Sequence, residues 1–132
     1  MMNKKINFNV SQNWNKPIYI ATQKEIILDD FNNEIIKYNE PIYLGEHNYQ
    51  PIVGSDLYAY MSAYGLTKNK LVRLYLDIEY KDTFKENDVA YLYGITPTDE
   101  LENGSNANYK VKTFIPQNTK IYVVFEEIIK EW

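Results

Sequence analysis

The clearest indication of the fold lies in the stretch Leu71-Val72-Arg73-Leu74-Tyr75-Leu76-Asp77-Ile78-Glu79-Tyr80. From residue 72 onward, apolar side chains and one tyrosine occupy every second position, and mostly polar side chains lie between them. Successive side chains of a strand point to opposite faces of a sheet. The stretch therefore predicts one long strand with a buried face and a solvated face.

Further strands are predicted on the C-terminal side of this stretch. Residues 81–87 are polar and turn-like, and residues 88–93 are short and apolar. Residues 109–115 and 120–129 are both strand-like, and only Pro116-Gln117-Asn118-Thr119 separates them. Such a short connection favours an antiparallel hairpin.

The N-terminal side also consists of short extended runs. Residues 17–21 and 24–28 precede Asp29-Asp30-Phe31-Asn32-Asn33, a run of turn-forming residues. Residues 35–44 are again extended, with an interruption at Pro41 that suggests an edge strand or a bend. Residues 48–53 are extended but irregular.

One helix is predicted between these two halves. Ser55 can serve as N-cap, Asp56 complements the positive helix terminus, and Gly65 lies where a C′ glycine is expected. Between them Leu57, Tyr60, Met61 and Tyr64 recur at helical spacing. We interpret this stripe as the face that docks the helix on the sheet.

The fold class that follows is mainly β. We expect a small β-barrel or sandwich with one short helix, at about residues 55–64, and long loops. The chain of 132 residues has the usual size of one domain, so residues 1–132 are predicted to form a single domain.

Composition excludes several kinds of protein. The net charge is −4, and the basic residues are scattered lysines with a single arginine, Arg73, so a sequence-specific nucleic-acid reader is not expected. There is no cysteine, no apolar run long enough to cross a membrane, and no apolar core in the N-terminal Met1–Asn9 to suggest a signal peptide. We expect folding in the cytosol. The 13 tyrosines fit either an interface or an AT-rich genome.

No catalytic constellation is evident, and we predict that the protein is not an enzyme. His47 is the single histidine and is interpreted as a loop residue beside Gly45. Asp29/Asp30, Asp99/Glu100/Glu102 and Glu126/Glu127 have no calcium-loop spacing and are interpreted as solvated faces and turns. No cofactor and no metal ligand is predicted. A carboxylate-dependent hydrolase stays open as an alternative.

Four segments resemble a known family, the head–tail joining (head-closure or stopper) proteins of tailed phages of Gram-positive hosts. Residues 56–65 are similar to the family's short helix that ends in Tyr-Gly, and residues 84–92 to its strand entry, with Asn87 in place of the usual glycine. Ala107-Asn108-Tyr109-Lys110-Val111 and residues 116–129 are similar to its last two strands. Residues 17–19 and 48–51 are similar but weaker.

The resemblance implies a mechanical role in the virion neck. Copies would form a homo-oligomeric ring, a hexamer or a dodecamer, beneath the portal or adaptor after assembly in the host cytoplasm. The ring would close the DNA channel after packaging and present a surface to the tail-terminator protein, and DNA would pass without sequence-specific binding or membrane contact. The alternative is a phage-encoded inhibitor of a host defence protein, such as a DNA mimic. That alternative predicts dense acidic clustering, whereas lysine and glutamate intermix along most strands.

Candidate partner- or channel-facing residues lie in two polar loops, chosen for length and polarity. The first is residues 96–106, the longest polar loop, and the second is residues 29–33. The candidates are Thr96, Asp99, Glu100, Glu102, Asn103 and Asn106 in the first loop, and Asp29, Asp30, Asn32 and Asn33 in the second.

Overall fold

A computed structural model describes residues 15–129 of the chain. The N-terminal stretch from which no signal peptide is expected lies outside these residues. The elements are β1 (Lys16–Ala21), β2 (Gln23–Leu28), β3 (Glu34–Tyr38), β4 (Ile42–His47), β5 (Gln50–Pro51), α2 (Gly54–Tyr64), β6 (Leu71–Asp77), the 3-10 helix η1 (Ile78–Tyr80), β7 (Val89–Tyr91), β8 (Tyr109–Pro116) and β9 (Lys120–Glu127).

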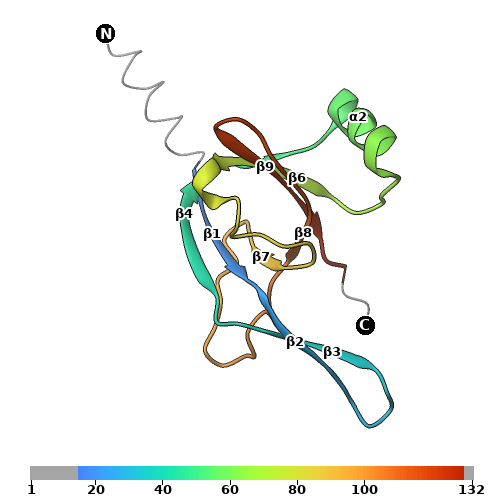
Figure 1. The fold of residues 1–132 in the computed structure, drawn as a ribbon, viewed down its shortest axis with the longest axis vertical. Helices are drawn as coiled ribbons and strands as arrows, with labels where there is room; N and C mark the ends of the chain where they lie inside the picture. Colours follow the sequence, from blue (N-terminus) through green and yellow to red (C-terminus); the bar gives the residue numbers. More distant parts are fainter. Residues whose placement is uncertain (1–14, 130–132) are drawn as a thin grey trace.

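Most strands belong to one curled sheet, which has the form of a half-barrel (Figure 1). Its seven strands follow the order β4-β1-β7-β8-β9-β6-β5, and neighbouring strands are antiparallel. The main core includes Ile18, Leu74, Val111 and Phe125, which are almost completely buried. The prediction of a mainly β, barrel-like fold with one short helix is confirmed.

Strand β6 has the predicted alternation but is shorter than predicted. Val72, Leu74 and Leu76 are buried, and Tyr75 and Asp77 are exposed. The strand ends at Asp77 because the chain turns into η1, where the amide of Ile78 bonds to the carbonyl of Thr119 at 3.0 Å. The face predicted to be solvated is also partly covered, since helix α2 packs over Leu71.

Strands β8 and β9 form the predicted hairpin, paired from Tyr109 opposite Glu127 to Pro116 opposite Ile121. A bulge between Val111 and Thr113 inserts Lys112 as an extra residue. The extended stretch predicted at residues 35–44 is two strands of different sheets, β3 and β4, and Pro41 lies between them. Strand β4 is an edge strand, which is one of the two outcomes that Pro41 suggested.

Helix α2 starts earlier than the sequence indicates. It begins at Gly54, so Val53 is the N-cap, without a side-chain cap, and Ser55 lies inside the first turn. The helix ends as predicted at Gly65, which has a φ of 105° and donates its amide to the carbonyl of Met61 at 2.9 Å. Tyr60 and Leu57 dock it on the sheet, whereas Tyr64 stays half-exposed.

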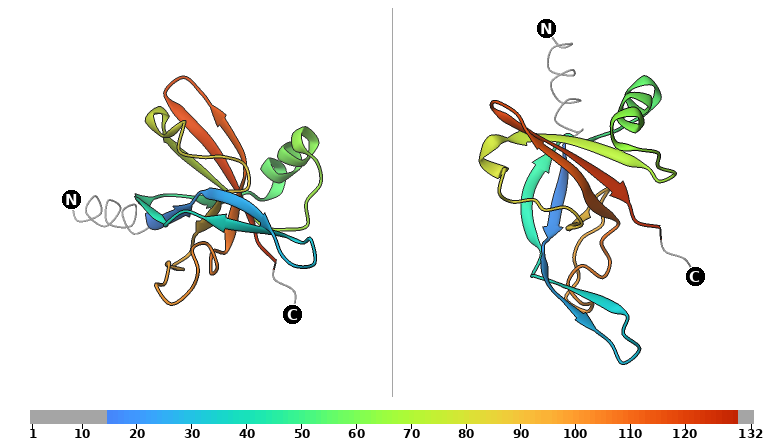
Figure 2. Two further views of the ribbon diagram at one scale, coloured as in Figure 1. Left: turned by 60° about the horizontal axis from the view of Figure 1, so that its bottom comes forward. Right: turned by 45° about the vertical axis from the view of Figure 1, so that its right-hand side comes forward.

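Strands β2 and β3 form a separate two-stranded hairpin that projects from the half-barrel (Figure 2). Its tip is the predicted turn at residues 29–33. A two-stranded hairpin has little stability on its own in water, so its base depends on the body of the protein. There the side chain of Asp88 accepts the amide of Gln23 at 3.1 Å.

Candidate functional site

The hairpin tip is an ordered Asx-type turn that displays polar groups. The Asp29 carboxylate accepts the amides of Phe31 at 2.8 Å and Asn33 at 2.9 Å. The Asn33 hydrogen bond, aided by that of Phe31, lowers the pKa of Asp29. Asn32 has a φ of 62°, a conformation that asparagine tolerates. Asp30 is exposed beside it.

The second candidate loop, residues 96–106, is attached to the body of the protein and is also closed by a hydrogen bond of its own. The amide of Gly104 donates to the hydroxyl of Tyr91 in β7 at 2.8 Å. Within the loop, the Asn106 side chain donates to the carbonyl of Thr96 at 2.7 Å. Asp99, Glu100 and Glu102 keep exposed side chains.

The structure brings this loop against β3 of the hairpin. Lys37 pairs with Glu102 at 3.4 Å, and the Asn103 side chain donates to the carbonyl of Tyr38, also at 3.4 Å. The two predicted loops therefore belong to the same end of the molecule, although the contact is made by β3 and not by the turn at residues 29–33.

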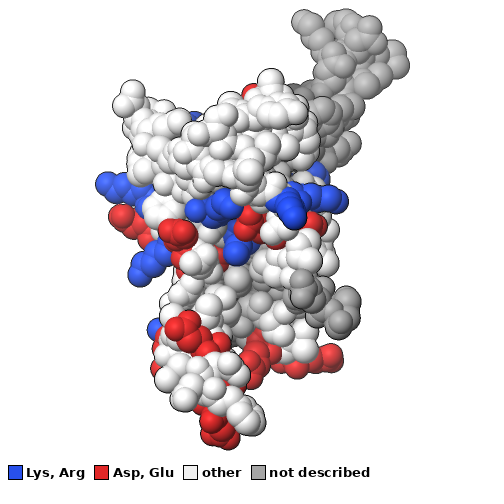
Figure 3. Space-filling view, turned by 90° about the vertical axis from the view of Figure 1, so that its right-hand side faces the viewer, with Lys and Arg blue, Asp and Glu red and all other residues white. Residues whose placement is uncertain are grey.

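Charge is segregated at this end (Figure 3). Residues 22–40 and 95–106 carry eight acidic and two basic side chains, a net charge of −6, whereas the other described residues carry nine of each. The acidic side chains are Glu25, Asp29, Asp30, Glu34, Glu40, Asp99, Glu100 and Glu102. The expected intermixing of lysine and glutamate therefore holds for the body but not for this end, because the fold joins two segments that are distant in sequence. We call it the acidic end.

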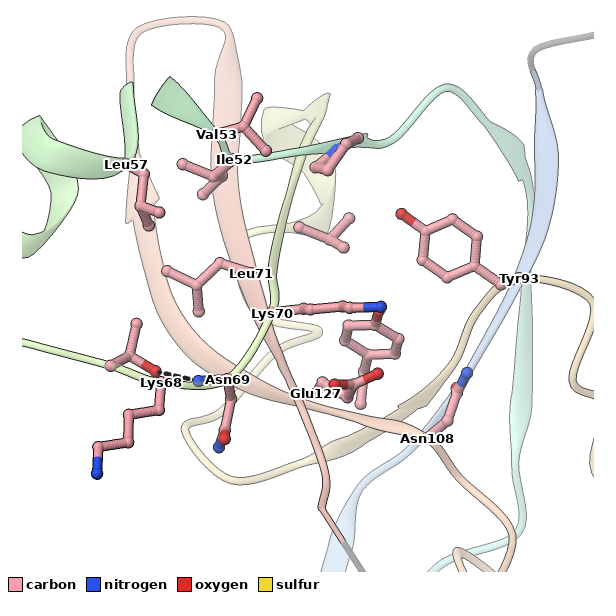
Figure 4. Close-up of a pocket in the computed structure, with 14 residues that line it drawn as sticks. Ile52, Val53, Leu57, Lys68, Asn69, Lys70, Leu71, Tyr93, Asn108 and Glu127 are labelled. Carbon is pink, nitrogen blue, oxygen red and sulfur yellow. Dashed lines mark hydrogen bonds between the residues drawn. The ribbon is translucent and has the colours of Figure 1, made fainter. Parts of the chain in front are cut away.

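A pocket of about 700 Å³ lies between α2, the β5–β6 region and the ends of β8 and β9 (Figure 4). Its volume falls within the range of roughly 300–1,000 Å³ that is usual for binding pockets. Its apolar lining includes Ile52, Val53, Leu57, Leu71, Tyr93 and Tyr109. Its polar lining includes Thr67, Lys68, Asn69, Lys70, Asn108 and Glu127.

Strained backbone occurs at the wall of this pocket. Tyr93 has a φ of 57°, a left-handed conformation that is unusual for a bulky residue. Its ring packs against Tyr49, with centroids 5.2 Å apart, and against Tyr109, with centroids 5.8 Å apart. The Lys16 ammonium group lies 5.1 Å from the centre of the Tyr93 ring.

Burial, reinforced by neighbouring Tyr93, raises the pKa of Tyr109 to about 12, so this hydroxyl is neutral at physiological pH.

Glu126 does not lie on a solvated face, contrary to the prediction for the Glu126/Glu127 pair. It is 7% exposed, and its carboxylate contacts Lys112 at 2.9 Å, Thr67 at 2.9 Å and Lys110 at 3.5 Å. The bulge at Lys112 adds the second lysine to this cluster. Burial raises the pKa of Glu126, but the hydrogen bonds from Lys112 and Thr67 outweigh it, so the pKa is lowered overall.

The single histidine closes a strand and is not in a loop. His47 is the last residue of β4, its Nε2 lies 2.7 Å from the carbonyl oxygen of Leu44, and its ring packs against Tyr80. Across residues 15–129, no three carboxylate, histidine or cysteine side chains come together as a metal site. No helix in this described part is long and apolar enough to span a membrane.

Neither the pocket nor the apolar character of the hairpin was predicted from the sequence. Ile26, Leu28, Phe31 and Ile36 are exposed, and Phe31 is 83% exposed. A signal for the hairpin was present, because Ile26-Ile27-Leu28 places apolar residues on both faces of a strand. The pocket had no such signal, since its residues come from segments that are far apart in the chain.

Comparison of the chain with protein-family models, with curated proteins and with solved structures finds no match in any of the three.

Proposed function

We propose that the protein is a structural component of a tailed-phage neck. In this role, copies form a ring beneath the portal or adaptor, close the DNA channel after packaging and provide the surface for tail attachment. The sequence resemblance to head-closure proteins motivates the proposal. The observation that carries it is the projecting hairpin, whose apolar side chains stay in water in the isolated chain.

The hairpin supports assembly because it exposes large apolar side chains in the single chain. Leu28 and Phe31 are 62% and 83% exposed, and the two strands pair with each other in a sheet separate from the half-barrel. Exposed apolar surface of this kind usually marks a protein–protein contact. A ring would bury it and would stabilise the hairpin at the same time.

The acidic end supports passage of DNA. Asp99, Glu100 and Glu102 are exposed on a loop that the Gly104–Tyr91 hydrogen bond attaches to the body, with no basic residue between positions 95 and 106. A surface of this charge repels phosphates. If the loop lines the channel, DNA passes without binding to it.

The proposal is tested by mixing the purified protein with portal rings, with and without adaptor, and imaging the complexes by electron microscopy. We expect an added ring of density on the portal, and weaker addition with Phe31→Ser. The matched control is Leu66→Ser, which removes an equally exposed apolar side chain, 88% exposed, from outside the hairpin. Portal rings without added density, in both preparations, would contradict the proposal.

The charge of the acidic end also favours the second candidate, an inhibitor of a host defence protein that mimics DNA. Eight carboxylates near one end give such a surface the sign of a nucleic acid. Competition between labelled DNA and this protein for host DNA-binding defence proteins tests it. Displacement that is lost in Asp99→Asn/Glu100→Gln/Glu102→Gln would favour the inhibitor.

A further inference from the structure

We propose that the β2–β3 hairpin of one copy docks its tip in the pocket beside α2 of a second copy. This inference rests on the proposed ring and names the contact that would join its subunits. We call the hairpin tip, residues 28–34, the arm, and the pocket shown in Figure 4 the socket.

The arm offers apolar side chains surrounded by negative charge. Leu28 and Phe31 are the most exposed large apolar residues of the hairpin. Asp29, Asp30 and Glu34 lie beside them. The Asx turn holds this tip in one conformation, so little conformational entropy is lost when it binds.

The socket has the complementary composition. Ile52, Val53 and Leu57 supply an apolar wall, and Tyr93 supplies an exposed aromatic ring. Lys68 and Lys70 are exposed on the rim, where no described salt bridge engages them. Among the described lining residues, Glu127 is the one carboxylate, so their ionic groups are net positive.

Apolar character and charge therefore favour a second copy of this chain as the occupant. Phe31 and Leu28 would enter the apolar part, while Asp30 and Glu34 would face Lys68 and Lys70. Opposite charges placed this way set the register of a contact and accelerate association. A DNA segment is disfavoured in the socket, because its wall is apolar and its described rim offers two lysines, Lys68 and Lys70.

The arm and the socket are different surfaces of one chain, so the contact is heterologous. Contacts of this kind propagate from copy to copy and close into a ring when the rotation between copies allows it. The hairpin is directed away from the half-barrel in Figure 1 and in the right-hand view of Figure 2, which leaves its tip free to reach a neighbour.

Disulfide trapping tests the contact directly, because the chain contains no cysteine. Phe31→Cys and Val53→Cys replace exposed residues of the arm and the socket, 83% and 64% exposed. A mixture of the two variants under mild oxidation should give a heterodimer, and the double variant should give a ladder of higher oligomers. Phe31→Cys mixed with Gln117→Cys, on the exposed β8–β9 turn, is the control.

The proposal would be overturned if Phe31→Cys formed as much disulfide with the control Gln117→Cys as with Val53→Cys. It would also be overturned if the double variant formed an intramolecular disulfide and no ladder of oligomers. A charge exchange gives an independent measurement by sedimentation. Lys70→Glu should weaken self-association by about tenfold, and adding Asp30→Lys in the same chain should restore part of it. No effect of either change would also count against the arm and socket.

The outcome is separable from that of the proposed function. Density on the portal without arm–socket trapping would leave the neck role standing and remove this contact. Arm–socket oligomers that fail to add to portal rings would support this contact and contradict the neck role.

Discussion

The buried hydroxyl of Tyr49 accepts the backbone amide of Tyr93 at 2.7 Å and so holds a turn in which Tyr93 and Gly94 both have positive φ. The turn is closed by a bond from the amide of Ile95 to the carbonyl of Leu92 at 3.3 Å. Because Tyr93 lies in the socket wall, this one hydrogen bond links the core to the shape of the pocket.

Removing that hydroxyl tests the link. In Tyr49→Phe the Tyr93 amide loses its acceptor while the ring packing is kept, so we expect a loss of about 1 kcal/mol in the free energy of unfolding. Urea denaturation measures it. Tyr64→Phe makes the same chemical change on a half-exposed ring and should have almost no effect. Equal effects from the two variants would show that the Tyr49 bond has no special role.

The ionised carboxylate of Glu126 is expected to stabilise the fold at neutral pH, and this contribution is expected to be lost in acid. Because its folded pKa is lowered below 4.5, its contribution is complete above the unfolded pKa and is lost as the pH falls through the folded value. Glu126→Gln should therefore lower stability by about 1–2 kcal/mol near pH 7 and by much less near pH 3. Denaturation at both pH values measures the difference, and a difference independent of pH would contradict the assignment.

Asp88 predicts the opposite pH dependence. It is buried, with its carboxylate accepting the amides of Gln23 at 3.1 Å and Lys85 at 2.9 Å. Burial raises its pKa above 3.8 despite these bonds, so its protonation stabilises the fold as the pH falls through the folded pKa. Asp88→Asn keeps one acceptor and should lower stability by about 1–2 kcal/mol at pH 7. The difference in free energy of unfolding between the wild-type protein and this variant should widen in mild acid. A difference that narrows would contradict a raised pKa of Asp88.

Local patterns predicted the strands because they depend on neighbouring residues alone. The alternation in β6 arises from burial of one face, and the Asn87 position illustrates the same logic for turns. Asn87 ends the predicted turn-like stretch at residues 81–87, and it has a φ of 72°, which asparagine adopts more readily than most residues. The end of β6 was missed because Ile78 and Tyr80 continue the alternation while the chain already turns.

The site was less predictable because it depends on contacts between distant segments. The polar loops were identified, but their common acidic end follows from the packing of β3 against residues 96–106. The sequence around Glu126 does not indicate that Thr67 and two lysines surround its carboxylate, so a solvated position is predicted for it. The socket could not be predicted from the sequence, because its lining residues come from segments that are far apart in the chain.

The attachment of the acidic loop to the hairpin depends on Gly104. A Cβ at this position would lie 2.6 Å from Cδ2 of Tyr38, in the ring of the last residue of β3. Gly104→Ala therefore forces the Tyr38 ring away and strains a φ of 82°. We expect a loss of about 1–3 kcal/mol in the free energy of unfolding and faster amide exchange in residues 96–106. Gly94→Ala is the matched control, since Gly94 has the same φ of 82° but no atom within 4 Å of the position that its new Cβ would take. It carries the backbone strain alone, so an equal loss in both variants would mean that Tyr38 does not anchor the loop.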